Sequence, residues 1–242
     1  MAMQDSPRLR IGISACLLGQ EVRFDGGHKR DRFLTEVLGP FVEWVPVCPE
    51  VELGLGTPRE TLRLVRTAEG VRMITTRTGL DHTDGMNAWA ERRLEELARE
   101  DLCGYVLKKD SPSCGMERVK VFGAAKMAER QGRGLFAAAL LERFPSLPVE
   151  EEGRLSDPRL RENFIERTFA YRRLKDLFAG RWSVGAFVRF HTAHKMSLLA
   201  HSTTAYQELG RLVARARELP RHELRDRYER EFMARGCGRR TA

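Results

Sequence analysis

Three cysteines stand where short apolar segments, the predicted strands of a sheet, come to an end. Cys16 and Cys48 each follow such a segment, and Cys114 lies in a loop of glycine, proline and serine after a third. Because the carboxyl ends of parallel strands share one edge of a sheet, where ligands bind, we expect the three thiols to converge. Three unrelated, inert core thiols are the alternative, since free cysteine is among the most commonly buried residue types.

Three converging thiolates suit particular metal groups. A structural zinc site needs four ligands and is usually built from close cysteine pairs, which this sequence lacks. A cubic iron–sulfur cluster held by only three cysteines leaves one iron open to act on a substrate as a Lewis acid. Glu50, two residues after Cys48, and Ser111, three before Cys114, can face the same cavity and move protons. For Glu50 alone, an exposed loop carboxylate is the alternative.

The chain has 242 residues and five cysteines. A disulfide scaffold is denser in cysteine and usually has an even number of them, so we do not expect one here. We expect Cys103 to be a buried small hydrophobe and Cys237 to be an exposed thiol in the basic tail. The longest apolar runs fall well short of the roughly 20 residues that a membrane-spanning helix requires. The N-terminal segment lacks the cleavage site of a signal peptide, so we expect a cytoplasmic protein.

The order of the predicted elements is typical of an α/β protein. Apolar segments predict strands at residues 10–14, 41–48, 62–65, 71–75, 105–107, 119–122 and 147–149. Helical spacing of apolar residues predicts helices over 81–100 and 134–144. Strands that alternate with helices predict a Rossmann-like parallel sheet with helices on its faces, and the two strands within 62–75 predict a hairpin.

Beyond residue 153 the strand signals stop and the pattern becomes helical. Asp157 followed by Pro158 is typical of a helix start. Further helices are predicted over residues 184–199, 203–217 and 222–234. The sequence therefore predicts an α/β domain at residues 1–153 and a smaller, all-α domain at 154–242.

Positive charge is concentrated in the helical part. Residues 1–150 carry 22 basic and 22 acidic side chains, whereas residues 151–242 carry 20 basic and 12 acidic ones, which accounts for the whole net charge of +8. Such asymmetry predicts a polyanionic partner, and the lack of a spanning segment favours nucleic acid over a membrane. A solvated helical face is the alternative for any single basic side chain.

Four motifs occur in order within residues 9–153, namely Ser14–Gly19, Phe24–Arg30, Cys48–Glu50 and Leu107–Gly115. Together they resemble the TudS-type thiouracil desulfidase family. The segments Glu162–Phe164, His191–Lys195 and Leu198–Ser202 are similar to a domain of unknown function that is often fused to that family. The fused arrangement resembles bacterial enzymes that convert 4-thiouridine in tRNA to uridine.

The resemblance implies that Cys16, Cys48 and Cys114 ligate a [4Fe–4S] cluster. It also implies that Glu50 is the catalytic acid/base and that Ser111 is an assisting hydroxyl. The thiocarbonyl sulfur, a soft ligand, would bind the open iron while water activated by Glu50 attacks the ring carbon, so the cleavage of the carbon–sulfur bond is not a redox step. A turn is the alternative for the segment 25–28. The same motifs suggest substrate contacts from Asp25, His28, Lys108 and Ser113.

In the basic domain, contacts with an RNA backbone require only positive charge and reach. The candidates are Arg172, Arg173, Lys175, Arg189 and Lys195. His191, His194 and His201 share one face of a predicted helix, but no carboxylate or cysteine lies near them in sequence to complete a metal site. We expect these histidines to pack in the core or to contact phosphate.

The leading hypothesis is a [4Fe–4S]-dependent desulfidase whose substrate and partner is tRNA containing 4-thiouridine. The first alternative is a desulfidase of free thiouracil or thionucleosides, in which the helical domain serves stability or a protein partner. The second alternative, from another class, is a non-catalytic, metal-stabilised nucleic-acid-binding protein.

Overall fold

The computed structural model describes residues 8–123 and 128–236, so Cys237 lies outside the described residues. The chain forms two compact units. The first comprises the chain up to Phe144 together with Val149–Arg154, and the second comprises Pro145–Pro148 and the chain from Leu155. The segment Val149–Arg154 belongs to the first unit because it contains the last strand of that unit's sheet.

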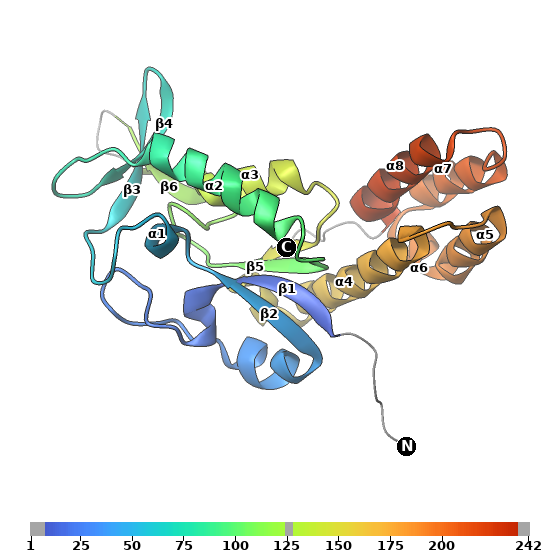
Figure 1. Cartoon of the computed structure of the whole chain (residues 1–242), viewed down its shortest axis with the longest axis horizontal. Helices are drawn as coiled ribbons and strands as arrows, with labels where there is room; N and C mark the ends of the chain where they lie inside the picture. Colours follow the sequence, from blue (N-terminus) through green and yellow to red (C-terminus); the bar gives the residue numbers. More distant parts are fainter. Residues whose placement is uncertain (1–7, 124–127, 237–242) are drawn as a thin grey trace. The chain divides into compact units, whose positions relative to one another are not determined.

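A four-stranded parallel sheet forms the centre of the first unit (Figure 1). In spatial order its strands are β2 (Val42–Val47), β1 (Leu9–Ser14), β5 (Gly104–Leu107) and β8 (Val149–Glu151). Every residue of β5 and of β8 is buried, which is typical of parallel strands covered on both faces. The predicted Rossmann-like α/β fold is confirmed.

The strand order reverses at β1, which lies between β2 and β5. The chain runs from β1 to β2, and only later returns to pair β5 with the other side of β1, with Gly12 opposite Tyr105. Such a reversal leaves a crevice at the carboxyl ends of the strands on either side of it. The segments that follow β1, β2 and β5 therefore border this crevice.

Helices α2 (Thr83–Leu97) and α3 (Leu135–Arg143) lie side by side in the first unit (Figure 1). The ring of Phe136 in α3 lies 5.5 Å from that of Trp89 in α2 and 6.0 Å from that of Tyr105 in β5, measured between centroids. Gly12 of β1 leaves the space that Tyr105 fills, because a Cβ atom at position 12 would lie 2.2 Å from that ring. Any larger residue at position 12 would displace this core.

A second, mixed sheet was not expected from the sequence. Its order is β4 (Gly70–Thr75), β3 (Leu62–Thr67), β6 (Val119–Phe122) and β7 (Ala128–Gly132). The predicted hairpin is confirmed, since β3 and β4 pair antiparallel. However, β6 pairs with β3 and β7 rather than joining the parallel sheet. Strand β7 gave no sequence signal, because its residues are polar and mostly exposed.

Short helical segments connect the larger elements. They are η1 (Ala15–Leu18), η2 (Phe33–Leu38), η3 (Gly39–Phe41), α1 (Pro49–Glu52), η4 (Arg154–Ser156) and η5 (Phe232–Gly236). Gly19 ends η1 with a φ of 94°, in the left-handed region that favours glycine.

The second unit is helical. Its main helices are α4 (Pro158–Phe178), α5 (Val184–Ala193), α6 (Lys195–His201), α7 (Thr203–Ala214) and α8 (Arg221–Glu231). Asp157 caps α4 by accepting hydrogen bonds from the amides of Arg159 and Leu160, so the predicted helix start is confirmed. The core of the unit includes Leu174, Phe187, Leu209, Leu224 and Tyr228, all fully buried.

The single helix predicted over residues 184–199 is in fact two helices, α5 and α6, which meet at His194. The Nδ1 atom of His194 donates a hydrogen bond of 2.8 Å to the carbonyl oxygen of Phe190. This side chain therefore competes for a helical carbonyl, as local polar side chains do at helix ends. Among the described helices, none combines the length and the apolar composition that crossing a bilayer requires.

Candidate active site

Each of three cysteines lies at the carboxyl end of a strand in the parallel sheet. Cys16 is in η1 directly after β1, Cys48 lies between β2 and α1, and Cys114 follows β5. All three side chains line one cavity of about 360 Å³. The structure thus brings together the thiols that their positions in the sequence predicted to converge.

Local hydrogen bonds fix the backbone of each cysteine. The carbonyl oxygen of Cys16 accepts from the amide of Lys29 at 2.9 Å, which ties the loop after η1 back to η1 itself. The amide of Cys48 donates to the Glu52 carboxylate at 3.0 Å. The amide of Cys114 donates to the Ser111 hydroxyl at 3.1 Å. The thiols therefore project from three anchored turns.

The surroundings of the thiols oppose their ionisation. Burial raises the pKa of Cys16 to about 11, and the neighbouring Cys48 adds to this shift. Burial likewise raises the pKa of Cys48 and raises that of Cys114 furthest. A bound metal reverses this preference, because a coordinating thiol is deprotonated by the positive charge of the ion. In the absence of a cation, these buried thiols are not reactive nucleophiles.

The donor set fits an iron–sulfur cluster better than a single ion. No group of three or more His, Cys, Asp or Glu side chains within residues 8–123 and 128–236 is placed to hold one metal ion. A cubic cluster binds each thiolate through a different iron atom, so its ligands stand further apart than those of one ion. Three soft sulfur donors around one cavity therefore fit such a cluster.

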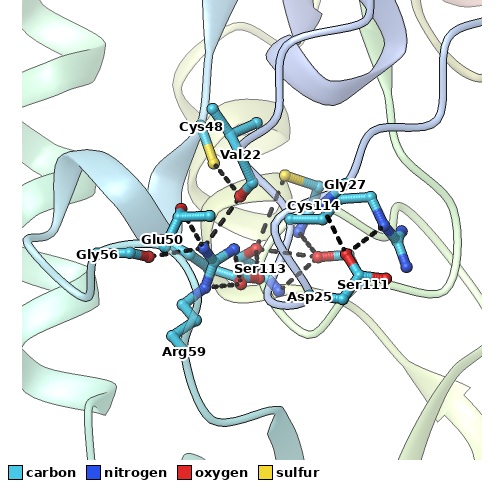
Figure 2. A network of polar contacts seen from close by, with 12 residues as sticks. Val22, Asp25, Gly27, Cys48, Glu50, Gly56, Arg59, Ser111, Ser113 and Cys114 are labelled. Carbon is cyan, nitrogen blue, oxygen red and sulfur yellow. Dashed lines mark hydrogen bonds and ion pairs between the residues drawn. The ribbon is translucent and has the colours of Figure 1, made fainter.

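Glu50 lies at the same cavity and both of its carboxylate oxygens are engaged (Figure 2). Its Oε1 atom accepts a hydrogen bond from the Ser113 hydroxyl at 2.7 Å. Its Oε2 atom accepts from Arg59, at 2.9 Å from Nε and 2.6 Å from Nη2. Its side chain is 15% exposed, so Glu50 is not the exposed loop carboxylate of the alternative reading.

Arg59 is a residue of this site that sequence reasoning missed. Its side chain is only 7% exposed, and besides Glu50 it donates to the carbonyl oxygens of Val22 and Gly56, each at 2.9 Å. Val22 also lies next to the Cys48 thiol, at 3.8 Å. Arg59 therefore links the carboxylate to the loop after η1. Only the short sequence distance to Glu50 could have indicated it, and the loop between them has no periodic pattern.

The structure gives the two serines different positions relative to Glu50. Ser113, assigned from the sequence to the substrate, is the direct partner of Glu50, whereas Ser111 lies 2.9 Å from the Ser113 hydroxyl and is one step further from the carboxylate. The hydroxyl of Ser113 also lies 3.7 Å from the Cys114 sulfur. The three oxygens form a continuous hydrogen-bonded chain from Ser111 through Ser113 to Glu50.

The start of α3 holds this serine loop in place. The amide of Leu135 donates to the carbonyl of Pro112, and that of Ala137 donates to the carbonyl of Ser113, both at 3.1 Å. Gly134 permits this approach, because a Cβ atom there would lie 2.5 Å from the Ser113 carbonyl. The site therefore requires glycine at position 134, where the predicted helix at 134–144 begins, because a larger residue would push the serine loop away.

Of the remaining predicted substrate residues, one lines the cavity and two do not. Lys108 lines it, and its Nζ atom forms an ion pair of 2.5 Å with Glu152. Asp25 is exposed, pairs with Arg23, and accepts from the Gly27 amide, which lowers the pKa of the Asp25 carboxyl. His28 is exposed and its Nδ1 accepts from a backbone amide. Asp25 and His28 thus stabilise a turn beside the cavity.

The predicted RNA contacts in the helical unit differ in how far their charges are already engaged. Arg172 pairs with Asp176, Arg173 donates to the His194 ring at 3.3 Å, and Lys175 lies over the ring of Tyr171. Arg189 and Lys195 are exposed. His191, His194 and His201 do not share one continuous helix, because helix α5 ends before His194 and helix α6 begins after it.

These features define a parallel α/β protein with a candidate active site built from three cysteine thiols, a carboxylate and a buried arginine. The chain belongs to the 2-thiouracil desulfurase family, whose model matches residues 11–152. That match contains the three cysteines, Glu50 and both serines, and it confirms the family that the motifs resembled. A second model, for a protein of unknown function named DUF1722, matches residues 195–239.

Two similar proteins match this chain over most of their own length. The uncharacterized protein YbbK of Bacillus subtilis strain 168 is 32% identical over 154 residues, which are 61% of this chain and 98% of YbbK. The solved structure of the [4Fe-4S]-dependent thiouracil desulfidase TudS is 34% identical, with a TM-score of 0.50, over 62% of this chain and 94% of that chain. Neither match extends over the whole chain, so the helical unit requires its own functional argument.

Proposed function

We propose that this protein removes sulfur from thiolated uracil with the help of a [4Fe–4S] cluster held by Cys16, Cys48 and Cys114, and that its substrate is 4-thiouridine in tRNA. The observation that carries the chemistry is one cavity of about 360 Å³ lined by the three thiols together with Glu50. The TudS relative, named as a [4Fe-4S]-dependent thiouracil desulfidase, supports both the cluster and the substrate class.

The reaction balances as a hydrolysis. Water supplies the oxygen of the product carbonyl, sulfur leaves as hydrogen sulfide, and no electron acceptor or donor is consumed. With three protein ligands, the cluster would supply one open iron as a Lewis acid for the thiocarbonyl sulfur. The protein's own residues then have to take a proton from water and to return one to the departing sulfur.

Glu50 is our candidate for the proton transfers. Its Oε2 is occupied by Arg59, so Oε1, which faces Ser113, is the oxygen left to exchange a proton. The hydroxyls of Ser113 and Ser111 continue the hydrogen-bonded path away from that oxygen. Since the Ser113 hydroxyl also contacts the Cys114 sulfur, this path passes beside one of the three cysteines that would hold the cluster. We therefore assign the base to Glu50 and the relay to the two serines.

The charge distribution supports a polymeric substrate. Residues 1–150 are balanced at 22 basic and 22 acidic side chains, while residues 151–242 carry an excess of eight basic ones. A free thiouracil carries no phosphate and needs no such excess. An RNA backbone is attracted by it at long range. The helical unit, proposed as residues 154–242, would therefore hold the tRNA, and the proposed cytoplasmic location is where tRNA is found.

A free thiolated base or nucleoside is the second candidate, and the family name favours it. The test is to reconstitute the full chain anaerobically and to offer it tRNA containing 4-thiouridine, free 4-thiouridine and 2-thiouracil in parallel. Faster release of sulfide from the tRNA at equal concentration of thiolated base is expected. Turnover of the free base with none of the tRNA would refute the tRNA substrate.

A single substitution at Glu50 tests the chemistry itself. Glu50→Gln keeps the shape of the side chain and one oxygen that can accept from Arg59, but it removes the basicity, so it should abolish sulfide release while iron and labile sulfide remain bound. Full activity in that variant would refute the assignment of the base. A colourless wild-type protein that holds one zinc ion per chain would instead support the non-catalytic alternative.

A further inference from the structure

A second cavity lies within the helical unit, between α5 and α7, and no part of the desulfidase chemistry uses it. Its volume is about 660 Å³, against about 360 Å³ for the cysteine cavity. The two helices that line it can be followed in Figure 1. Its apolar lining residues include Val184, Val188 and Val213, and Tyr206 contributes an aromatic ring. A cavity of this size can hold a ligand of many atoms.

Three cations line this cavity without a counter-ion. Lys195, Arg211 and Arg217 are exposed, and none of their side chains makes an ion pair or hydrogen bond with any described residue. No carboxylate is among the described residues that line it. Nearby arginines of the same unit behave differently: Arg215 pairs with Glu218 at 2.9 Å and Arg235 pairs with Glu208 at 2.9 Å. The cavity therefore presents uncompensated positive charge beside an apolar wall.

A buried polar group is also aimed into this cavity. His191 is 4% exposed and lines it, and its Nδ1 lies 3.1 Å from the hydroxyl of Tyr228. Its other ring nitrogen, Nε2, has no hydrogen-bond partner among the described residues. Burial lowers the pKa of His191, so its ring is neutral at neutral pH. Nε2 is not among the buried polar atoms that lack a partner, so this atom reaches the open space of the cavity and is free to bond to water or to a ligand there.

A glycine keeps the same cavity open. Gly210 lies in the interior of α7, where glycine weakens a helix relative to alanine. No steric conflict requires it, because a Cβ atom at this position would meet no other atom within 4 Å. Since Gly210 lines the cavity, any side chain there would extend into the open space. The glycine costs helix stability and preserves volume.

We propose that this cavity binds one unpaired nucleotide of the RNA, with the base against Tyr206 and the valine side chains, His191 as its polar contact, and the phosphate on Lys195, Arg211 and Arg217. A nucleotide is the ligand class that joins a flat, partly apolar ring to an anion within these dimensions. The choice of RNA over a free nucleotide as its source rests on the proposed tRNA substrate. Aromatic stacking beside a basic groove is the general way in which proteins hold single-stranded nucleic acid.

The test uses the full chain and measures RNA binding rather than activity. Loss of catalysis therefore cannot be mistaken for loss of binding at this cavity. The probe is a fluorescein-labelled, single-stranded uridine hexanucleotide with a 5′ phosphate, followed by fluorescence anisotropy at several salt concentrations. Unlabelled UMP and uridine serve as competitors. Gly210→Leu fills the cavity without changing charge, and Arg211→Gln combined with Arg217→Gln removes charge without filling it. Arg181→Gln, a basic residue of the same unit outside the cavity, is the control for charge.

Gly210→Leu should weaken hexanucleotide binding by about tenfold or more, which is the scale of one lost base stack. The double arginine variant should weaken it and lower the salt slope by about 0.7 for each lost phosphate contact. Arg181→Gln should stay within about twofold of the wild type, and UMP should compete better than uridine. Gly210→Ala, which favours the helix, checks that any loss does not come from misfolding.

Two results would overturn the proposal. Hexanucleotide binding by Gly210→Leu within twofold of the wild type would show that the cavity is not used. Direct binding of UMP, measured by isothermal titration calorimetry, to a protein that does not bind the hexanucleotide would show a free nucleotide as the ligand and would exclude RNA. Failure of the desulfidase proposal is a separate result, since it would appear as absent sulfide release with hexanucleotide binding intact.

Discussion

Removing Arg59 should strand a carboxylate inside the α/β unit. The Arg59 side chain is 7% exposed and that of its partner Glu50 is 15% exposed. Two of the Arg59 hydrogen bonds go to Glu50, and others satisfy the carbonyl oxygens of Val22 and Gly56. In Arg59→Ala the carboxylate keeps only the Ser113 hydroxyl as a partner, and a cavity replaces the guanidinium.

The size of the effect follows from the burial of this pair. Breaking a buried ion pair by removing one partner costs about 3–5 kcal/mol, because the remaining charge is left without compensation. A whole domain is stable by only about 5–15 kcal/mol. With a slope of about 2 kcal/mol per molar urea, the midpoint of unfolding should fall by about 2 M. Glu50→Gln added to Arg59→Ala removes the stranded charge and should restore more than half of the loss.

The assay must report on the α/β unit alone. Trp182 is the one tryptophan of the chain in the helical unit, so a Trp182→Phe background leaves Trp44 and Trp89 as reporters of the first unit. Urea unfolding of cluster-free protein is followed by tryptophan fluorescence for both single variants and for the double variant. A midpoint shift below about 0.5 M in Arg59→Ala, or a double variant as unstable as Arg59→Ala, would refute the argument from a stranded charge.

Three further outcomes follow from the geometry. Cys114→Ser should bind little iron after reconstitution, whereas Cys103→Ser should bind as much as the wild type, because the Cys103 thiol is buried outside the cavity. Equal iron in both variants would contradict the ligand assignment. Ser113→Ala should lower kcat by about a hundredfold and Ser111→Ala by about tenfold, with KM little changed, because only Ser113 touches Glu50; the reverse order would make Ser111 the direct proton donor. Burial lowers the pKa of His191 below its ordinary 6.5, so the unfolded chain takes up the proton first as the pH falls. Thermal stability of the helical unit should therefore decrease from pH 7 to pH 5, and a His191→Gln variant with the same pH slope would contradict this.

The strands and the convergence of the cysteines could be predicted because they depend on local pattern and on one topological rule. Continuous apolar runs marked β1 and β5, and parallel strand ends meet at a single edge, so Cys16 and Cys114 were placed together without coordinates. Helix starts were equally local, since Asp157 caps the helix that follows it. These features need no knowledge of distant partners.

Tertiary contacts could not be predicted in the same way. Arg59 reaches Glu50 from an irregular loop, and nothing in its sequence neighbourhood distinguishes it from other arginines. The order of Ser111 and Ser113 depends on side-chain directions within one tight turn, which two residues of separation do not determine. Strand β7 is defined only by its pairing with β6, because its own residues are polar and exposed. In each case the deciding contact lies outside the local pattern.

Net charge is a further quantity that the structure refines. The excess of eight basic residues after position 150 counts every arginine equally, but Arg172 is paired with Asp176 and Arg235 is paired with Glu208. A paired arginine offers less attraction to a phosphate, because the carboxylate has to be displaced or repels it. The attraction of the helical unit for phosphate should therefore depend on the basic side chains that have no carboxylate partner. In the helical unit Arg211 and Arg217 meet that condition beside an open cavity, although the sequence alone gave them no priority over the paired residues.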